Sequence, residues 1–299
     1  MDFSLERIEQ RLSVKNTERN FSFAQNTTIG IGGNAPLAVF PENIAQLAQA
    51  LEVLNGEGAR WLVLGAGANV LASDNGFQGV VIKTDRLNAI DVADGLLCAE
   101  CGVRISSLLR YAQKKGLGGL SFMAGIPASV GGAVLMNAGV AEGHIGDRIR
   151  SVTVLEPDGK IRKFLRDECR FSYKRTLFSE GNRIILNAEL SLERRKSEEI
   201  GEEIRTVLDN RKRLPAGRSM GCVFKNPPGV SAGALIEQAG LKGAREGGAV
   251  VSERHANFII NSGGATAENV RTLIERIRSE VCRIFHVSLE EEIRYIGDF

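Results

Sequence analysis

The chain has 299 residues, 43% of them hydrophobic and 25% charged, with a formal net charge of +2 at pH 7. This length and composition are ordinary for a globular protein of two domains, and the near-neutral balance excludes the strong basic field of a nucleic-acid-binding protein. No apolar run approaches the ~20 residues of a membrane-spanning helix and no secretory signal pattern opens the sequence, so we expect a cytoplasmic protein.

The first half of the chain mixes helix and strand patterns. Apolar positions spaced three and four residues apart predict helices over residues 5–12, 44–51 and 105–112. Short apolar runs predict buried strands over residues 61–64 and 80–82.

The second half is richer in strand signals. A hairpin is predicted over residues 152–165, because turn residues separate two β-rich runs there. A long alternating strand over residues 183–192 is followed by a charged helix at about 197–214. The last third then begins again with its own elements: a helix over residues 234–239, a strand over 256–260, and a long helix capped by Thr266. These patterns together predict an α+β protein.

Two glycine-rich loops are the main candidates for a cofactor site. The first follows a predicted strand, but it is not the dinucleotide-binding fingerprint, because Val70 stands where the third glycine would fall. The second has so many small residues that close backbone approach to a flat ring and a pyrophosphate is indicated, with a helix N-terminus near Val130 facing the phosphate charge. The candidate residues are Gly65, Ala66, Gly67, Ala68, Asn69 and Val70 in the first loop, and Gly125, Ile126, Pro127, Ser129, Gly131, Gly132, Asn137, Ala138 and Gly139 in the second.

The five cysteines are scattered and odd in number, which is not the pattern of a disulfide framework. Cys98 and Cys101 form one CxxC, but no second pair and no nearby histidine accompany it. We therefore expect no metal site, and two small residues at the end of a strand is the simpler interpretation.

The segment Gly221-Cys222-Val223-Phe224-Lys225-Asn226-Pro227 places a thiol beside a glycine, with a cation and an amide just downstream. That grouping suits protonation of a carbon next to an anionic substrate. Together with residues 252–258, residues 289–293 and both glycine loops, this segment resembles the UDP-N-acetylenolpyruvoylglucosamine reductase family, also called MurB.

The resemblance implies a vanillyl-alcohol-oxidase-like (PCMH-type) FAD-binding fold of two subdomains, followed by a C-terminal α/β substrate-binding domain. The expected divisions are residues 1–84, 85–195 and 196–299. FAD is expected to be noncovalent, because neither His nor Cys occurs before Cys98. The short segment between Tyr173 and Cys222 is similar to the family branch that lacks a tyrosine-bearing loop insertion, and we expect a monomer.

The activity implied is NADPH-dependent reduction of the enolpyruvyl group of UDP-N-acetylglucosamine enolpyruvate to UDP-N-acetylmuramate, in peptidoglycan precursor synthesis. Reduced FAD would give a hydride from N5, and a Ser or Cys of the family would give the proton. Cys222 occupies that position, and a thiol, with an ordinary pKa of ~8.5, is a far stronger acid than an alcohol. Glu292 matches the catalytic glutamate of the family.

The third catalytic position departs from the family pattern, which is Tyr-Arg-x-Ser. This chain has Tyr173-Lys174-Arg175-Thr176, so a gap-free match places Lys174 at the arginine, with Arg175 as the alternative. If the segment is a strand, only one of the two side chains can face the substrate.

The resemblance also suggests which residues bind the substrate. They are Tyr173, Lys225 and Asn226 for the substrate and its diphosphate, with Arg254 or His255 in support. For His255 a hydrogen-bonded structural role remains the alternative. A flavin oxidase of alcohols or lactones would share the glycine loops without the segment around Cys222, and a non-catalytic nucleotide-binding protein is the other alternative.

Overall fold

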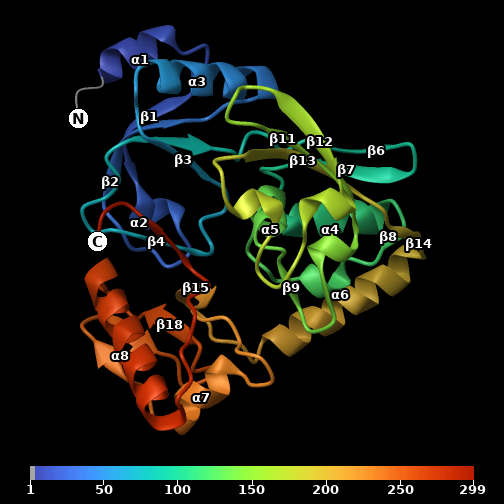
Figure 1. Ribbon diagram of the computed structural model, residues 1–299. Coiled ribbons are helices and arrows are strands. Elements are labelled where there is room, and N and C mark those ends of the chain that lie inside the picture. The colour runs from blue at the N-terminus through green and yellow to red at the C-terminus, as the bar shows by residue number, and fades with distance from the viewer. Residues whose placement is uncertain (1–3) are drawn as a thin grey trace. The chain divides into compact units, whose positions relative to one another are not determined.

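The computed structural model describes residues 4–299 (Figure 1). The chain divides into two compact units, and neither is one continuous stretch. Unit 1 comprises residues up to 19 with 37–66 and 79–211, and unit 2 comprises residues 20–36, 67–78 and 212–299. Two short N-terminal segments therefore join the C-terminal third, whereas the predicted three-part division at residues 84 and 195 stays a prediction.

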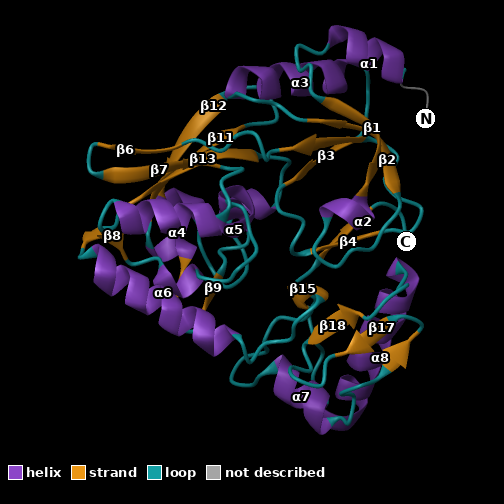
Figure 2. Ribbon diagram, turned by 180° about the vertical axis from the view of Figure 1, so that it is seen from behind, coloured by secondary structure: helices purple, strands orange, loops and turns teal. Residues whose placement is uncertain are grey.

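Unit 1 contains most of a four-stranded sheet in the order β1-β2-β5-β3. Strand β5 runs parallel to both β2 and β3, so crossover connections and not hairpins join these strands. Helices α1 and α3 lie together on one face of the sheet (Figures 1 and 2). The bounds are α1 Leu5–Arg11, β1 Thr17–Ser22, β2 Asn34–Val39, α3 Ile44–Gly56, β3 Trp61–Leu64 and β5 Val80–Lys83.

A second sheet of unit 1 has five antiparallel strands in the order β12-β11-β13-β7-β6. The predicted hairpin is confirmed as β11 and β12, which pair from Ser151 with Leu165 to Leu155 with Ile161. Helices α4 and α5 lie on one face of this sheet, and α6 packs against α4 (Figure 2). The bounds are β6 Ile90–Ala93, β7 Leu96–Glu100, α4 Ile105–Lys114, α5 Val130–Leu135, β11 Ile149–Leu155, β12 Ile161–Leu165, β13 Ile184–Leu190 and α6 Ser197–Arg211.

The buried side chains of unit 1 form one core that joins both of its sheets, from Ile8 of α1 to Leu190 of β13. Short elements connect the larger ones, and β9 contains Gly139 of the second glycine loop. They are β8 Leu117–Gly118, η1 Ser121–Met123, β9 Gly139–Val140, β10 Gly143–His144, η2 Ile145–Asp147, η3 Arg166–Cys169, η4 Leu177–Ser179 and β14 Glu193–Arg194.

Unit 2 is built on a four-stranded antiparallel sheet in the order β15-β18-β17-β16, with α8 packed against its strands β16 and β17. A separate parallel pair joins β4, from the first glycine loop, to β19 near the C-terminus. The bounds are α2 Phe23–Asn26, β4 Val70–Ala72, β15 Arg218–Cys222, α7 Ala232–Gln238, β16 Arg245–Glu246, β17 Ala249–Val251, β18 Phe258–Asn261, α8 Ala267–Phe285 and β19 Arg294–Ile296.

The first turn of α8 has two kinds of cap. The predicted cap is confirmed, because Thr266 Oγ1 accepts a hydrogen bond of 3.1 Å from Asn269 N. Asp74, from the segment inserted before β5, also accepts from Ala267 N at 2.8 Å and Glu268 N at 3.1 Å. A carboxylate at a helix N-terminus satisfies unpaired N–H groups and complements the helix dipole, so Asp74 fixes residues 67–78 to the C-terminal part of unit 2.

The predicted helices are confirmed as α1, α3, α4, α6, α7 and α8, with shifts of a few residues at their ends. The predicted strand over residues 256–260 begins at Phe258, because the residues before it form a turn in which Phe258 N donates to His255 O. Within residues 4–299, no helix combines the length and the apolar character needed to cross a bilayer.

Candidate active site

The two glycine-rich loops meet in unit 1 at Gly65 and Ser129. A Cβ atom built on Gly65 would lie 2.4 Å from Ser129 Oγ, closer than side-chain atoms approach each other. A side chain at position 65 would therefore displace the Ser129 hydroxyl. The two loops lie against each other at this point, and their role in binding one ligand stays a prediction.

Ser129 begins helix α5, as the sequence predicted for a helix starting near Val130. Its Oγ accepts from Gly132 N at 3.4 Å, and the side chain is buried. Some loop glycines have packing reasons of their own, since a Cβ on Gly131 would meet Cys101 at 2.9 Å and one on Gly139 would meet Gly143 O at 2.3 Å. At these two positions internal packing alone requires glycine.

Asn137 braces the end of the second loop. Its Nδ2 donates to Ser172 O at 2.9 Å, and its Oδ1 accepts from Gly146 N at 3.1 Å. The residue lies in the left-handed region at φ 43°, which asparagine tolerates better than most residues. Asn137 therefore links this loop to the segment that carries Tyr173 and Lys174.

Lys83, which was not predicted from the sequence, holds the first loop by a hydrogen bond to its backbone. Its Nζ is buried and donates to Gly65 O at 2.6 Å and to Asp85 Oδ2 at 2.8 Å. Burial lowers the pKa of Lys83, although the hydrogen bond and the charge of Asp85 oppose that shift. A lysine at the end of the apolar run Val80-Val81-Ile82, two residues before an aspartate, was the available signal.

Lys83→Met is expected to lower the free energy of unfolding by about 1–3 kcal/mol, because it removes a charged donor and leaves Gly65 O without that partner. Urea unfolding of the purified protein measures the change. The control is Lys160→Met, since the Lys160 side chain is 81% exposed beside Asp158, and it should stay within about 0.5 kcal/mol. Equal effects of the two substitutions would show that Lys83 does not hold the loop.

The remaining part of the first loop belongs to unit 2. Gly67, at φ 67°, accepts from Thr28 N at 3.0 Å, and a Cβ there would lie 2.3 Å from Asn26 O. Asn69 Nδ2 donates to Glu292 O at 3.0 Å, and Asn69 O accepts from Arg294 N at 3.0 Å. Two regions predicted separately, the cofactor loop and the C-terminal glutamate motif, are thus hydrogen-bonded neighbours.

Cys222 ends strand β15 directly after a β-bulge. Ser219 pairs with Ile260 and Cys222 with Phe258, so the bulged strand has one extra residue, and Gly221 takes φ 77° there. Bulges turn a strand and redirect its side chains, and they are common beside active sites. The glycine next to the thiol, which drew attention in the sequence, therefore has a defined backbone role.

Cys222 and Glu292 lie on adjacent segments of unit 2. Glu292 N donates to Val223 O at 2.7 Å, which joins the C-terminal motif to the residue after the thiol, and both side chains are partly buried. Buried Asn257, which sequence reasoning missed, holds the same segment through two bonds to Phe224, one to the backbone N at 2.9 Å and one to the backbone O at 2.8 Å. The structure thus pairs the two segments that carry these predicted catalytic residues, with Glu292 opposite Val223, the residue after Cys222.

His255 is arranged as a neutral imidazole. Burial lowers the pKa of His255, and its Nδ1 accepts from Asn257 N at 3.2 Å, so the ring proton belongs on Nε2. The ring also packs edge-on against Phe258 at 5.0 Å. These contacts support the structural role and leave Nε2–H as the one polar group that can serve a ligand.

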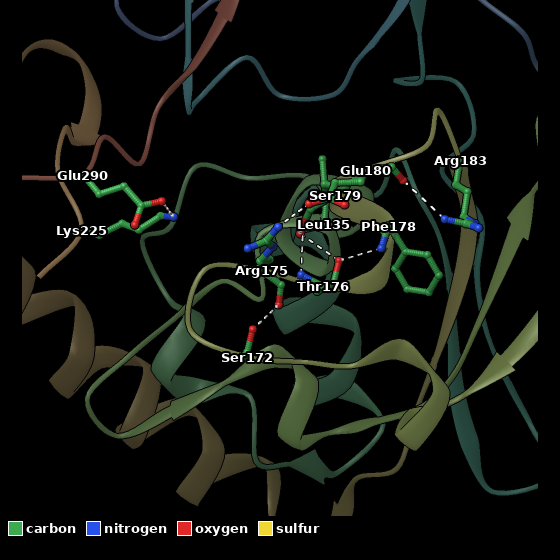
Figure 3. Close-up of polar contacts among 10 residues, drawn as sticks. All are labelled: Leu135, Ser172, Arg175, Thr176, Phe178, Ser179, Glu180, Arg183, Lys225 and Glu290. Carbon is green, nitrogen blue, oxygen red and sulfur yellow. Dashed lines mark hydrogen bonds and ion pairs between the residues drawn. The ribbon is translucent and has the colours of Figure 1, made fainter. Parts of the chain in front are cut away.

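The other predicted substrate residues of unit 2 differ in their surroundings. Lys225 forms an ion pair with Glu290 (Figure 3), and Asn226 Oδ1 accepts from Ala232 N at 2.9 Å at the start of α7. Arg254 is exposed and lines a surface pocket of about 340 Å³ together with Arg245. The structure thus places Lys225 next to a carboxylate that the substrate would have to replace.

The condition that Tyr173 and Lys174 lie in a strand is not met, because the segment is a tight turn. Ser172 and Arg175 bond to each other across it, with N to O distances of 2.9 and 3.3 Å, and Lys174 takes φ 56° between them. Strand alternation therefore does not decide which side chain serves the substrate. The Nζ of Lys174 lies 6.0 Å from the centre of the Tyr173 ring.

The partners of Arg175 distinguish it from Lys174. The Arg175 guanidinium pairs with Glu180, and both side chains are largely exposed (Figure 3). The next residue, Thr176, is buried, and its Oγ1 accepts from Phe178 N at 3.2 Å and donates to Leu135 O at 3.1 Å. Thr176 thus fixes the turn to helix α5, while Arg175 is paired with the carboxylate of Glu180.

Comparisons with known proteins identify the cofactor class and the family. Residues 35–165 match a family model described as an FAD binding domain, so the fold and its glycine loops define a flavoprotein of the vanillyl-alcohol-oxidase-like class. Residues 212–296 match the model of the UDP-N-acetylenolpyruvoylglucosamine reductase C-terminal domain. The chain belongs to the UDP-N-acetylenolpyruvoylglucosamine reductase family, and it is an oxidoreductase.

The similarity extends over nearly the whole chain. A reductase of this name from Caldicellulosiruptor saccharolyticus is 41% identical over 277 residues, covering 91% of this chain and 89% of that protein. One from Carboxydothermus hydrogenoformans is 39% identical over 298 residues and 98% of each chain. The crystal structure of the reductase from Thermus caldophilus superposes with a TM-score of 0.83 at 36% identity, over 94% of this chain and 99% of that one.

Proposed function

We propose that the protein uses NADPH to reduce the enolpyruvyl group of UDP-N-acetylglucosamine enolpyruvate to UDP-N-acetylmuramate, with Cys222 as the proton donor. The observation that carries the proposal is the hydrogen-bonded pairing of the Cys222 and Glu292 segments, within a domain that matches this reductase family. A flavin oxidase of alcohols would have no need for a thiol on one of two paired segments and a carboxyl group on the other.

The residues have separate tasks in the proposed reaction. FAD, when bound, supplies the hydride that goes to the terminal vinyl carbon. The thiol of Cys222 holds the proton that must reach the neighbouring carbon, where negative charge conjugated with the carboxylate develops. Glu292, as a neutral acid, donates a hydrogen bond to the substrate carboxylate, and the cation of Lys174 stabilises the growing charge.

The same proposal gives the nucleotide a set of polar contacts. Lys225 and Asn226 bind the diphosphate, for which Asn226 would use Nδ2–H, because an amide oxygen cannot donate a hydrogen bond to a phosphate and Oδ1 accepts from Ala232 N. Arg254, and His255 through Nε2–H, support the nucleotide, and Tyr173, whose side chain is 48% exposed, contacts the substrate. These proposed roles are based on the type of each residue and on the hydrogen bonds and ion pairs that it forms within its own unit.

The residues of the glycine loops fit FAD. In unit 1 Gly65 lies against the Ser129 hydroxyl with no side chain between them, whereas the first N–H groups of α5 already donate to Val103 O, Cys101 O and Ser129 Oγ. We propose that Gly65, Ser129 and the neighbouring loop residues hold the pyrophosphate and the ring by backbone contacts.

The purified protein is expected to be yellow and to release its flavin on acid precipitation, since neither His nor Cys occurs before Cys98 in the early loops. The absorbance of the supernatant and the pellet measures the release. Colour that stays in the pellet would contradict noncovalent binding, and a colourless protein that FAD cannot reconstitute would contradict the site.

The proposed reaction is tested in two half-reactions under anaerobic conditions. NADPH should bleach the flavin absorbance, and UDP-N-acetylglucosamine enolpyruvate should restore it with formation of UDP-N-acetylmuramate. Restoration by an alcohol-derived ketone but not by the enolpyruvyl substrate would favour a flavin dehydrogenase of alcohols. Bleaching without restoration by any substrate would leave only a flavin-binding protein, and the proposed function would be wrong.

A further inference from the structure

Within unit 2, the cation proposed to bind the diphosphate already has an acidic partner. The ammonium group of Lys225 pairs with the carboxylate of Glu290 (Figure 3). The Lys225 side chain is 21% exposed and that of Glu290 is 73% exposed, so the carboxylate approaches the lysine from the solvent side. An anion arriving from solvent meets the pair at its Glu290 end.

The backbone fixes this pairing in place. Lys225 N donates to Glu290 O at 2.8 Å, and the preceding residue Phe224 forms a β-bridge with Glu291. The two side chains therefore start from neighbouring backbone positions on paired segments. Their ion pair thus requires less ordering of long, flexible side chains than a pair between distant positions does. Most exposed ion pairs lack such support.

Glu290 is also distinct from the glutamates that follow it. The carboxylate of Glu291 is engaged by Arg278, at 3.1 Å, and by the hydroxyl of Tyr295. Glu292 is the proposed catalytic acid and hydrogen-bonds through its backbone N to Val223. Of the three consecutive acids, Glu290 is the one whose carboxylate lies against Lys225.

We propose that Glu290 is a specificity-determining residue that acts as an internal counterion, occupying Lys225 until the diphosphate of a nucleotide displaces it. The inference rests on the proposed role of Lys225 in binding the diphosphate. A carboxylate has one negative charge, whereas the diphosphate of a sugar nucleotide has about two and that of free UDP nearly three near neutral pH, so the diphosphate wins the competition and weaker anions do not. Glu290 thereby keeps adventitious monoanions off Lys225 at some loss of nucleotide affinity.

The test is a double-mutant cycle in the FAD-loaded protein, with UDP as the probe in isothermal titration. Glu290→Gln is expected to bind UDP about two- to fivefold more tightly than the unsubstituted protein at about 20 mM salt, because the competing charge is gone. The gain should shrink below about 1.5-fold at about 0.5 M salt, where exposed charges are screened. Glu280→Gln, which removes an acid paired with Arg283 at 2.8 Å on α8, is the matched control and should leave UDP binding unchanged.

Lys225→Met distinguishes this inference from the function on which it rests. If Lys225→Met binds UDP as well as the unsubstituted protein does, the proposed diphosphate role of Lys225 is wrong. If Lys225→Met weakens binding, then adding Glu290→Gln to it should change the affinity by less than about 1.5-fold, since no cation remains to compete for. A weaker UDP affinity in Glu290→Gln alone would overturn the inference and show that Glu290 positions Lys225. An equal gain in UDP affinity with and without the Lys225 side chain would also overturn it, and it would show that Glu290 merely repels the ligand.

Discussion

Cys222→Ala is expected to leave reduction of the flavin by NADPH unchanged and to slow its reoxidation by the enolpyruvyl substrate by ~10²–10⁴, the usual loss when a general acid is removed. The reason is that the thiol holds the proton for the carbon next to the one that receives hydride. Cys222 is partly buried, follows the bulge at Gly221 and lies next to the Glu292 segment. We therefore expect no other acid to replace its thiol as the proton donor. Stopped-flow absorbance of the two half-reactions measures both rates.

Two further variants make the Cys222 experiment decisive. Cys222→Ser should retain substantial activity, because a hydroxyl can also donate a proton from that position. Cys282→Ala is the matched control, since Cys282 is exposed on α8 in the same unit and should leave both rates unchanged. Near-normal reoxidation in Cys222→Ala, or a loss confined to the NADPH step, would exclude Cys222 as the donor.

The sequence predicted the regular elements well where local pattern and tertiary packing agree. Helix α4 buries Ile105, Leu108, Leu109 and Ala112 along one face, which is the spacing that predicted it. The hairpin of β11 and β12 follows from its turn residues for the same local reason. The residues that determine these elements lie within about a dozen positions of one another in the sequence.

The assignment of segments to units was not predictable from local pattern. Residues 67–78 join unit 2 because β4 pairs with β19 and because Asp74 caps α8, and both contacts reach partners about two hundred residues away in the sequence. A three-residue strand has too weak a pattern of its own to reveal such a partner. A boundary drawn in sequence order therefore had no local signal that these residues belong with the C-terminal third.

In the candidate site, too, the residues within motifs were predicted and the residues that hold the surrounding loops were not. Cys222 and Glu292 were identified from their motifs, but Asn257 and Lys83, which hold the surrounding loops, were not. A buried lysine and a buried asparagine are unremarkable in a sequence, and their importance comes from partners that folding supplies, such as Gly65 O for Lys83. Residues of this kind are identified only when the hydrogen bonds are known.

The tight turn at Lys174 was not predicted, for a physical reason as well. Positive φ is signalled in a sequence mainly by Gly, Asn or Asp, and lysine in that conformation gives no such signal. The conformation is imposed from outside by the Ser172–Arg175 bridge and by the buried Thr176 hydroxyl. The choice between Lys174 and Arg175 therefore has to be made on their partners.

Lys174→Ala is expected to lower turnover by ~10²–10³, the usual cost of removing a group aimed at developing negative charge. Arg175→Ala should be mild, because the Arg175 guanidinium is 66% exposed and already paired with Glu180. Lys174→Arg restores the residue that the family pattern carries here, and it should retain more activity than Lys174→Ala. Steady-state turnover with saturating NADPH and substrate measures all three variants.

The backbone of the turn provides the internal control for this prediction. Position 174 has φ 56°, and lysine, alanine and arginine bear a similar strain there, so the three residues differ in side chain and not in their preference for the turn. A severe loss in Lys174→Ala with unchanged thermal stability is then a loss of charge beside the substrate. A severe loss in Arg175→Ala with a mild loss in Lys174→Ala would reverse the assignment, and it would mean that the Arg175–Glu180 pair opens when the substrate carboxylate arrives. Glu180→Gln separates these cases, because releasing Arg175 from its partner should raise activity only if Arg175 is the residue that binds the substrate.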